Sequence, residues 1–378
     1  MISKMIFWGS LLFVGYAYFG YPLCLYVLGL FRTRPVKRAD IHPTVSFIIA
    51  AYNEERRIRE KLENTLNQDY PRGAMEIIVA SDCSSDGTDE IVRTYAARGA
   101  ILIRSLKRNG KEYAQKLAVD ASNGEILVFS DTATILEPNS VTKIVKNFAD
   151  PTVGCVSSTD RFVDQRGNVS GEGAYIRYEM QLRKMESGVN TLVGLSGSYF
   201  AARREVCRNW AVDLQSDFNT LLNSVQMGLR GVSDPESVGY YRNIADEKKE
   251  FERKVRTILR GITVFMKSLH LVSPVHYGLF AWQLISHKLC RWLVPFALGT
   301  ALLSNSVLVQ DAMLYSGLFI LQCAFYAAAL WGIVRMNALT TKLIKLPAYF
   351  VLVNASIAHA WYRYTRGERS VAWEPSRR

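Results

Sequence analysis

Polar side chains follow three short, β-branched apolar segments of the chain, at the point where each segment ends. They are Asn53, Glu54, Asp82 and Asp131. One or two carboxylates can hold Mg²⁺ or Mn²⁺ while phosphate oxygens fill the other coordination positions, and the metal then neutralises a diphosphate leaving group. A carboxylate can instead accept a hydrogen bond from a base or a ribose. Taken singly, Asp82 or Asp131 could be a turn or helix-capping residue, but acids after aligned strands favour a ligand site.

The segments around these residues alternate between strand and helix patterns. Apolar runs predict strands, and the stretches between them predict helices. This alternation indicates βαβ units and a mostly parallel mixed sheet with flanking helices, which is an α/β fold. Because ligands bind at the carboxyl ends of such strands, we expect the polar clusters to share one edge of the sheet. The predicted strands are 44–51, 75–80, 100–104 and 125–129, and the predicted helices are 55–66, 89–98 and 111–122.

Motifs and composition exclude several classes of protein. No GxGxxG follows the first predicted strand and no Walker A motif occurs, so the usual glycine cradles for phosphate are missing. The 378 residues carry a net charge of +12 and are 49% hydrophobic, which rules out a disordered chain. A basic chain of this hydropathy is either a soluble nucleic-acid binder or a membrane protein near anionic lipid or anionic substrates. We see no basic patch with interleaved aromatic residues, so a nucleic-acid partner is not expected.

The apolar residues lie at the two ends of the chain. Met5 to Phe31 contains no charged residue and is long enough to span a bilayer. A signal peptide is the alternative, but the apolar stretch is too long and no small-residue cleavage site follows it. Four basic residues follow at once, which by the positive-inside rule puts the N-terminus outside and the next segment in the cytosol. They are Arg32, Arg34, Lys37 and Arg38.

Three further apolar segments, at 292–309, 313–334 and 339–361, are candidate spans near the C-terminus. If all three cross the membrane, the basic tail at 363–378 ends outside, against the positive-inside rule. Either the last segment is interfacial, since it contains Lys342 and Lys345, or one break is misplaced, and the sequence leaves both alternatives open.

Several motifs together resemble those of family-2 inverting glycosyltransferases of the GT-A fold. They are VSFIIAAYNE at 45–54, ASD at 80–82 with SSDGT at 84–88, Gly110-Lys111, and FSD at 129–131. The resemblance runs from about residue 44 to residue 261, and the membrane layout is similar to that of membrane-bound bacterial members. It implies a nucleotide-sugar donor, usually a UDP-sugar. The implied donor-binding residues are Ala51, Asn53, Glu54, Asp82, Lys111 and Asp131.

Asp131 matches the first acid of the family's DxD metal motif. The resemblance therefore implies Mg²⁺ or Mn²⁺ as a cofactor, with Asp131 as a metal ligand. The sequence departs from the motif at Ala133, which stands where the second acid is expected. One carboxylate together with diphosphate oxygens could still hold the metal, with weaker binding.

The segment Gly194 to Arg204 is similar to the family's glycine-containing acceptor loop, so Gly197 and Ser198 are implied to bind the acceptor. The family next carries Glu-Asp, with the Asp as general base, and here the pair is Ser216-Asp217. Inverting transfer needs one carboxylate to take the proton of the acceptor hydroxyl. We therefore expect Asp217 to be the catalytic base, with a plain helix-start acid as the alternative.

A basic segment occupies the place of the family's QxxRW motif. Arg256 matches the Arg of that motif, while Arg253 and Thr257 replace the Gln and the Trp. We expect Arg256 and Arg260 to contact the donor diphosphate. The alternative is a basic helix that faces lipid headgroups. The missing Trp and the small number of spans disfavour a processive polymer synthase.

These observations predict an inverting glycosyltransferase of the bacterial inner membrane, with a cytosolic catalytic domain and a lipid-linked or glycan acceptor in envelope polysaccharide or glycolipid assembly. A processive polysaccharide synthase and a catalytically silent partner of an export complex are the alternatives. The sugar, the linkage and the oligomeric state are left open. The expected divisions are an anchor with a basic boundary, a catalytic domain, interfacial helices that lie on the bilayer, a membrane block and a tail, at 1–38, 39–261, 262–291, 292–362 and 363–378.

Overall fold

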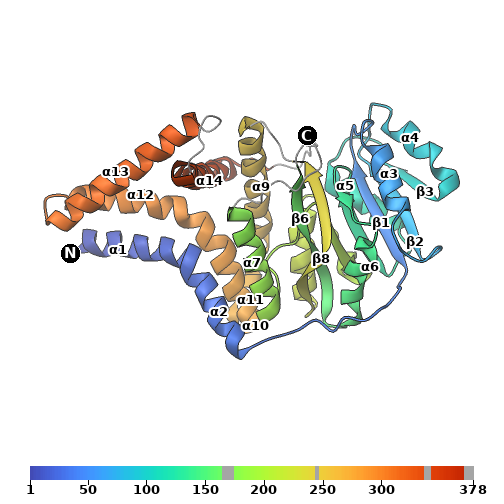
Figure 1. Cartoon of the computed structure of the whole chain (residues 1–378), viewed down its shortest axis with the longest axis horizontal. Coiled ribbons are helices and arrows are strands. Elements are labelled where there is room, and N and C mark those ends of the chain that lie inside the picture. The colour runs from blue at the N-terminus through green and yellow to red at the C-terminus, as the bar shows by residue number, and fades with distance from the viewer. Residues whose placement is uncertain (164–173, 243–246, 336–341, 370–378) are drawn as a thin grey trace. The chain divides into compact units, whose positions relative to one another are not determined.

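The structure is a computed structural model that describes residues 1–163, 174–242, 247–335 and 342–369 (Figure 1). Its contacts divide the chain into two compact units. The sheet unit contains Leu28–Ala245 and Val264–Leu271, and the helical unit contains Met1–Val27, Asp246–Thr263 and Val272–Arg369.

The sheet unit is built on one eight-stranded mixed sheet with the order β3-β2-β1-β4-β7-β6-β8-β5. The four strands predicted from the sequence pair in parallel, in the order β3-β2-β1-β4, which confirms the α/β prediction. The strands are β1 Val45–Ala51, β2 Met75–Ser81, β3 Ala100–Arg104, β4 Ile126–Asp131, β5 Ile135–Leu136, β6 Val153–Val163, β7 Tyr199–Arg203 and β8 Arg230–Arg242.

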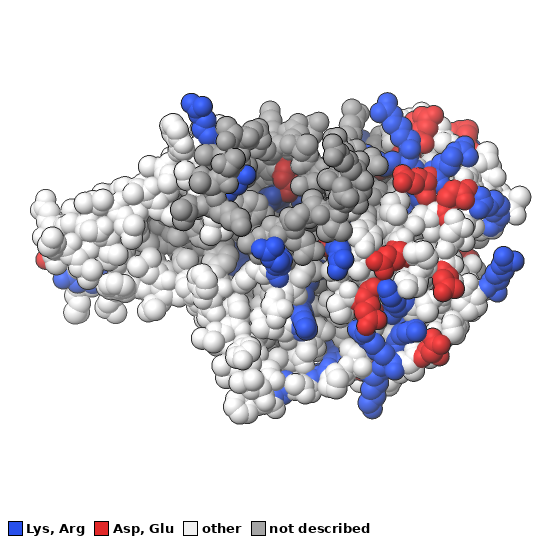
Figure 2. Space-filling model, viewed as in Figure 1, with Lys and Arg blue, Asp and Glu red and all other residues white. Residues whose placement is uncertain are grey.

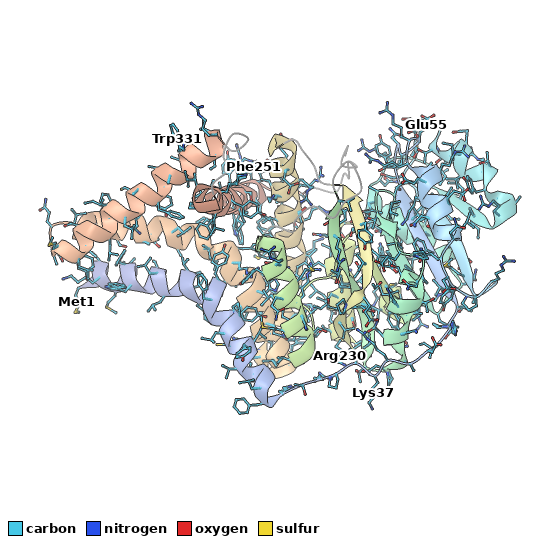
Figure 3. The ribbon with its side chains drawn as sticks, viewed as in Figure 1. Met1, Lys37, Glu55, Arg230, Phe251 and Trp331 are labelled. Carbon is cyan, nitrogen blue, oxygen red and sulfur yellow. The ribbon has the colours of Figure 1, made fainter. Side chains whose placement is uncertain are left out.

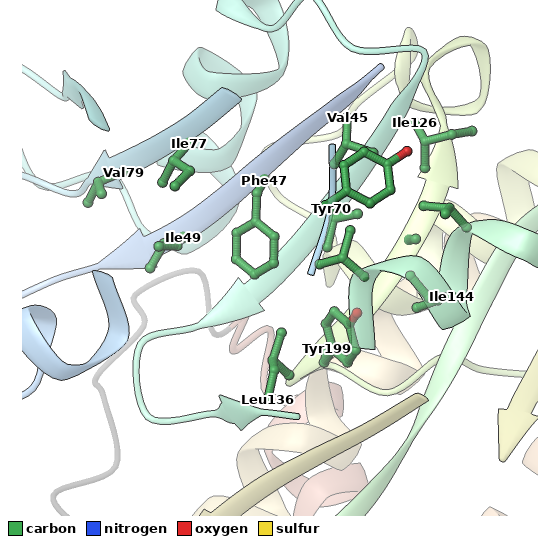
Figure 4. Close-up of a cluster of buried hydrophobic side chains, with 14 of the residues drawn as sticks. Val45, Phe47, Ile49, Tyr70, Ile77, Val79, Ile126, Leu136, Ile144 and Tyr199 are labelled. Atoms are coloured by element: carbon green, nitrogen blue, oxygen red, sulfur yellow. The ribbon is translucent and has the colours of Figure 1, made fainter. Parts of the chain in front are cut away.

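Alternate residues of β1 enter two different cores, one on each face of the sheet. Phe47 and Ile49 pack with buried residues of α3, α4 and α6 in the cluster shown in Figure 4. Ile48 points the other way and packs with residues of α5 and α8. This period of two is what a strand buried on both faces requires. The helices of the sheet unit are α3 Ile58–Leu66, α4 Thr88–Thr94, α5 Lys111–Ala121, α6 Ser140–Val145, α7 Ala174–Val189 and α8 Ser216–Gln226.

The sheet has two edges with different contents. β7 is antiparallel to both β4 and β6, so β6 runs in the direction of β1 and β4, and β8 runs parallel to β6. The carboxyl edge, where β1, β2 and β4 end, therefore also carries the residues that precede β7. The opposite amino edge carries the starts of β1, β6 and β8. In Figure 3, Glu55 marks the carboxyl edge, while Lys37 and Arg230 mark the amino edge.

Residues 34–38, which follow the apolar helix that ends at Phe31, are bound to the amino edge of the sheet. Arg230 donates hydrogen bonds to the carbonyl oxygens of Arg34 and Pro35, at 2.7 and 3.1 Å, and its guanidinium also contacts Asp150. The backbone N–H of Lys37 donates to Asp150 Oδ2 at 3.3 Å. Arg38 contacts Asp234 at 3.2 Å. Two of the four basic residues expected at the membrane boundary, Arg34 and Arg38, therefore also bind this unit, since Arg34 donates to Asn190.

Three predicted elements differ from the structure at one end by two residues or more. The helix predicted over 55–66 begins at Ile58. β4 continues through Asp131, so this residue ends the strand and does not follow it. The helix predicted over 89–98 ends at Thr94, and a 3-10 turn, Ala96–Arg98, leads to Gly99. Gly99 has φ 92°, a left-handed conformation that ends a helix and suits glycine.

Two helices that lie wholly or mostly in the helical unit are long and apolar enough to cross a membrane, judged by length and composition over the residues that the structure describes. They are Ile2–Phe31, which includes a π-turn at Tyr16–Gly20, and Met313–Val334. Figure 2 shows few charged side chains over α1, α12 and α13. The helices are α1 Ile2–Gly15, α2 Tyr21–Phe31, α9 Glu247–Lys267, α10 Pro274–Tyr277, α11 Leu279–Leu284, α12 Arg291–Leu308, α13 Met313–Val334 and α14 Lys342–Thr365.

Candidate functional site

Asp82 lies fully buried after β2 and fixes the loop that leads into α5. Its Oδ1 accepts the backbone N–H of Asn109 at 2.8 Å, and its Oδ2 accepts that of Gly110 at 2.9 Å. Burial raises the pKa of Asp82, and these two hydrogen bonds oppose the rise. Gly110 has φ 98°, which favours glycine, and α5 begins at the next residue, Lys111. Asp82 therefore sets the position of Lys111.

Asn53 and Glu54 follow β1 in a strained turn beside the loop after β2. Asn53 has φ 52°, and its side-chain oxygen accepts the backbone N–H of Ser85 at 2.8 Å. The carbonyl oxygen of Ala51 accepts the backbone N–H of Asp82 at 2.9 Å. Burial raises the pKa of Glu54 to about 7, with Arg57 opposing the rise and Asp131 adding to it. The structure thus brings Ala51, Asn53, Glu54 and Asp82 to one edge.

Lys111 and Asp131 form the centre of the carboxyl edge. Lys111 Nζ lies 2.5 Å from Asp131 Oδ1 and donates to the carbonyl oxygen of Gly197 at 3.2 Å. The backbone N–H of Asp131 donates to the carbonyl oxygen of Ser198 at 2.9 Å. The donor-side and acceptor-side residues predicted from the sequence are therefore in direct contact.

Asp217 lies in the first turn of α8 and faces the same loop. Its Oδ1 accepts the backbone N–H of Phe218 at 2.8 Å, and its Oδ2 accepts a hydrogen bond from Gln215 at 3.1 Å. A Cβ atom at Gly197 would lie 2.7 Å from Asp217 Oδ2, which is closer than such atoms approach. Glycine at position 197 thus leaves room for this carboxylate beside the acceptor loop.

Asp160, near the end of β6, is a site residue that the sequence analysis missed. Its carboxylate accepts hydrogen bonds from the side chains of Ser196 and Ser198, each at 2.6 Å, and so fixes the acceptor loop. Burial raises the pKa of Asp160 against these hydrogen bonds, and the charge of Asp131 adds to the rise. No motif marks this residue. The available signal is an acid within a strand of apolar and small residues.

Lys61, on α3, was missed as well. Its side chain is 0% exposed, and Nζ donates to Ser130 Oγ at 2.8 Å and to the carbonyl oxygen of Thr134 at 2.6 Å. These two acceptors flank Asp131. Burial lowers the pKa of Lys61 to about 7, and Asp131 opposes this change. The signal in the sequence is a lysine at the helical spacing of the core residues Ile58 and Leu62.

The side chains at this edge fit a metal ion only if the donor supplies further ligands. Among the described residues there is no group of three His, Cys, Asp or Glu side chains arranged to hold a metal. Asp131 is 31% exposed and offers one carboxylate, and the position of the second acid is Ala133. Asp131 would hold Mg²⁺ or Mn²⁺ together with diphosphate oxygens, and the metal would neutralise charge on the leaving group.

Arg256 and Arg260 lie on α9, within the part of that helix that belongs to the helical unit. Arg253, the residue in place of the motif's Gln, pairs with Glu250 at 2.8 Å. The contact of Arg256 and Arg260 with the donor stays a prediction.

Comparison with known proteins identifies the domain. Residues 46–210 match the family model described as glycosyl transferase family 2. A hyaluronan synthase of Streptococcus pyogenes is 30% identical over 192 residues, which are 47% of this chain and 45% of that protein. A beta-monoglucosyldiacylglycerol synthase of Trichormus variabilis is 25% identical over 226 residues, 56% of this chain and 48% of that protein. The chain thus matches about half the length of these relatives.

A solved structure shares the fold. The mannosyltransferase from Pyrobaculum calidifontis, in complex with GDP-Man and Mn²⁺, superposes with a TM-score of 0.74 at 22% identity, covering 98% of this chain and 100% of that one. The motifs that suggested the family lie inside or directly beside the matched residues, so the resemblance to family 2 is confirmed for residues 46–210. The chain carries a glycosyltransferase family 2 domain with a GT-A-like fold.

Proposed function

We propose that this protein is a membrane-bound inverting glycosyltransferase that moves one sugar from a nucleotide-sugar to a lipid-linked or glycan acceptor. The observation that carries the proposal is the contiguous set Lys111, Asp131, Gly197 and Asp217 at the carboxyl edge. Lys111 can bind a diphosphate directly, and Asp131 can bind it through a metal ion. Beside them, the carboxylate of Asp217 faces the loop that contains Gly197. A donor with a diphosphate leaving group and an acceptor hydroxyl together match this chemistry.

In the proposed reaction, Asp217 takes the proton of the acceptor hydroxyl as its oxygen attacks the anomeric carbon, and the bond to the nucleoside diphosphate breaks on the opposite face. One displacement inverts the anomeric centre and needs no covalent intermediate. Lys111 stabilises the negative charge that develops on the diphosphate. Asp82 and Asn53 shape the nucleotide pocket. Arg256 and Arg260 are proposed to add charge at the diphosphate.

The proposed acceptor is lipid-linked because two helices are apolar enough to span a membrane, and a substrate in the bilayer would be within reach of a tethered enzyme. One relative is named beta-monoglucosyldiacylglycerol synthase, a name that contains a lipid, and another is named hyaluronan synthase, a name that contains a glycan. We place the protein in the bacterial inner membrane with the sheet unit in the cytosol, on the strength of the basic residues after Phe31.

The donor test incubates membranes that contain the full chain with a panel of UDP- and GDP-sugars, with and without Mn²⁺, and measures the released nucleotide. Asp217→Asn is the matched control, because Asn keeps the shape of the side chain and cannot take a proton. We expect release with one donor class, and a loss of about 10³-fold in the variant. Equal and negligible release by both proteins would reject the enzyme in favour of a silent partner of an export complex.

The acceptor test uses the identified donor with lipid-linked and soluble acceptors, and resolves product length on a gel. One added sugar on the lipid-linked acceptor supports the proposal. A ladder of long products would indicate a processive synthase instead. Activity confined to soluble acceptors would reject the lipid-linked acceptor.

A further inference from the structure

Lys61 is a fully buried cation directly beneath the turn that carries Asp131. Its Nζ bridges two neutral oxygens, Ser130 Oγ and the carbonyl of Thr134, at 2.8 and 2.6 Å. It also lies over the ring of Phe47, 5.3 Å from the centroid. Lys61 thus contacts the residue before Asp131 and the residue that closes the turn after it.

This arrangement is costly for folding alone. A buried ammonium loses its hydration, and hydrogen bonds to neutral oxygens return only part of that free energy. An apolar side chain would fill the same place among Ile58, Leu62 and Phe47 without that cost. A buried cation at this position therefore indicates that Lys61 has a functional role at the turn 130–134.

The turn is also fixed from its other sides. The Thr132 hydroxyl donates to the carbonyl oxygen of Ala50 at 2.9 Å, and the backbone N–H of Asp131 donates to the carbonyl oxygen of Ser198 at 2.9 Å. Lys61 completes this support from α3. With Ala133 in place of a second acid, the turn carries one carboxylate between a cation beneath it, Lys61, and a cation beside it, Lys111.

We propose that Lys61 is a positioning residue for the donor diphosphate: it fixes the turn 130–134 and supplies a positive potential beneath it that partly replaces a metal ion. This inference rests on the proposed function. A turn with one acid and two lysines attracts a diphosphate even without a metal, whereas a turn with two acids depends on the cation to offset its own charge. The donor is therefore expected to bind measurably without Mn²⁺.

The test measures the affinity of the full chain in detergent for UDP and for GDP at pH 6.5, with and without Mn²⁺, in the wild type, Lys61→Met and Thr65→Val. Thr65 is the matched control, since it is buried on the same helix and donates to the carbonyl oxygen of Lys61 at 2.8 Å. We expect Lys61→Met to weaken nucleotide binding about tenfold without Mn²⁺ and about threefold with saturating Mn²⁺, while Thr65→Val changes neither.

Protection of the buried thiols Cys155 and Cys207 from alkylation shows whether each variant is folded. If Lys61→Met is unfolded, Lys61→Gln takes its place, because Gln is neutral and can still donate one hydrogen bond. Equal affinities of the folded Lys61 variant and Thr65→Val would overturn the inference. Wild-type protein that binds neither nucleotide would instead count against the proposed function.

Discussion

The two edges of the sheet both carry buried charges, and they arrange them in opposite ways. At the amino edge, Arg230 and Asp150 lie 3.1 Å apart with side chains 5% and 6% exposed, so each charge has an opposite partner. At the carboxyl edge, Glu54 and Asp160 are acids near a third acid, Asp131. The pair at the amino edge balances its own charge, whereas at the carboxyl edge Asp131 raises the pKa of the two other acids although Lys111 pairs with it.

The pKa values follow this difference. Burial raises the pKa of Asp150, but hydrogen bonds from Thr152, Lys37 and Arg230 outweigh it and bring the pKa to about 2. Glu54 shows the reverse, with burial and the charge of Asp131 raising its pKa to about 7 against the effect of Arg57. At neutral pH the ionised Asp150 of the amino edge therefore stabilises the folded state, whereas ionisation of Glu54 at the carboxyl edge destabilises it.

The largest effect on stability is expected at the amino edge. Arg230→Met leaves Asp150 buried without its cation and should lower the free energy of unfolding by about 3–5 kcal/mol. Thiol labelling of Cys155 and Cys207 during thermal unfolding measures it. The contribution of Asp150 is fully present above pH 3.8 and is lost as the pH falls towards about 2.

Arg98→Met is the control for this experiment, since the Arg98–Glu63 pair is 48% and 42% exposed and an exposed ion pair contributes little to stability. Sugar transfer per folded molecule should stay unchanged in both variants. A fall in sugar transfer per folded Arg230→Met molecule would show that the amino edge also contributes to activity, against the comparison drawn above.

Gly197→Ala tests the carboxyl edge. The new methyl group would lie 2.7 Å from Asp217 Oδ2, and the flexible carboxylate can rotate away at little cost in stability. A displaced base should lower kcat by about 10²-fold with unfolding little affected. Gly188→Ala is the control, because a Cβ there meets no atom within 4 Å. An unfolded Gly197→Ala protein would show that this glycine serves packing instead.

Glu54→Gln should raise the free energy of unfolding, because the carboxylate of Glu54 destabilises the carboxyl edge when no ligand is bound. Because its pKa rises from 4.5 to about 7 on folding, the folded state binds more protons within this window, and stability falls as the pH rises through it. Gln mimics the protonated form, so we expect a gain of about 2 kcal/mol at pH 8 and almost none at pH 4. Equal gains at both pH values would assign the effect to side-chain shape.

The smallest effect is expected from restoring the second acid of the motif. Ala133→Asp adds a carboxylate two residues from Asp131 and should lower the Mn²⁺ concentration for half-maximal transfer about fivefold. Ala133→Asn has the same shape without the charge and is the control. An unchanged Mn²⁺ requirement in Ala133→Asp would mean that this position does not face the metal.

The sequence predicts those parts of the molecule whose pattern is local. Strands β1 to β4 and the polar residues at their ends follow from period and turn chemistry, because a strand buried on both faces shows a continuous apolar run. Asp160 and Lys61 could not be predicted in this way. Asp160 reaches the site only through the antiparallel pairing of β6 with β7, and Lys61 through the packing of α3 under β4. Such contacts depend on topology, which spacing along the chain does not encode.

The contacts of residues 34–38 with the amino edge also decide where a shortened, soluble form of the sheet unit can begin. A chain that starts at residue 39 would lack the carbonyl groups of Arg34 and Pro35 and the N–H of Lys37, all of which bond to Arg230 or Asp150. Trimming the chain after Arg38 would therefore remove hydrogen-bond partners of the buried pair Arg230–Asp150, and the shortened protein is expected to aggregate. A protein engineer should keep every residue from Arg34 onward and remove only the apolar helix before it.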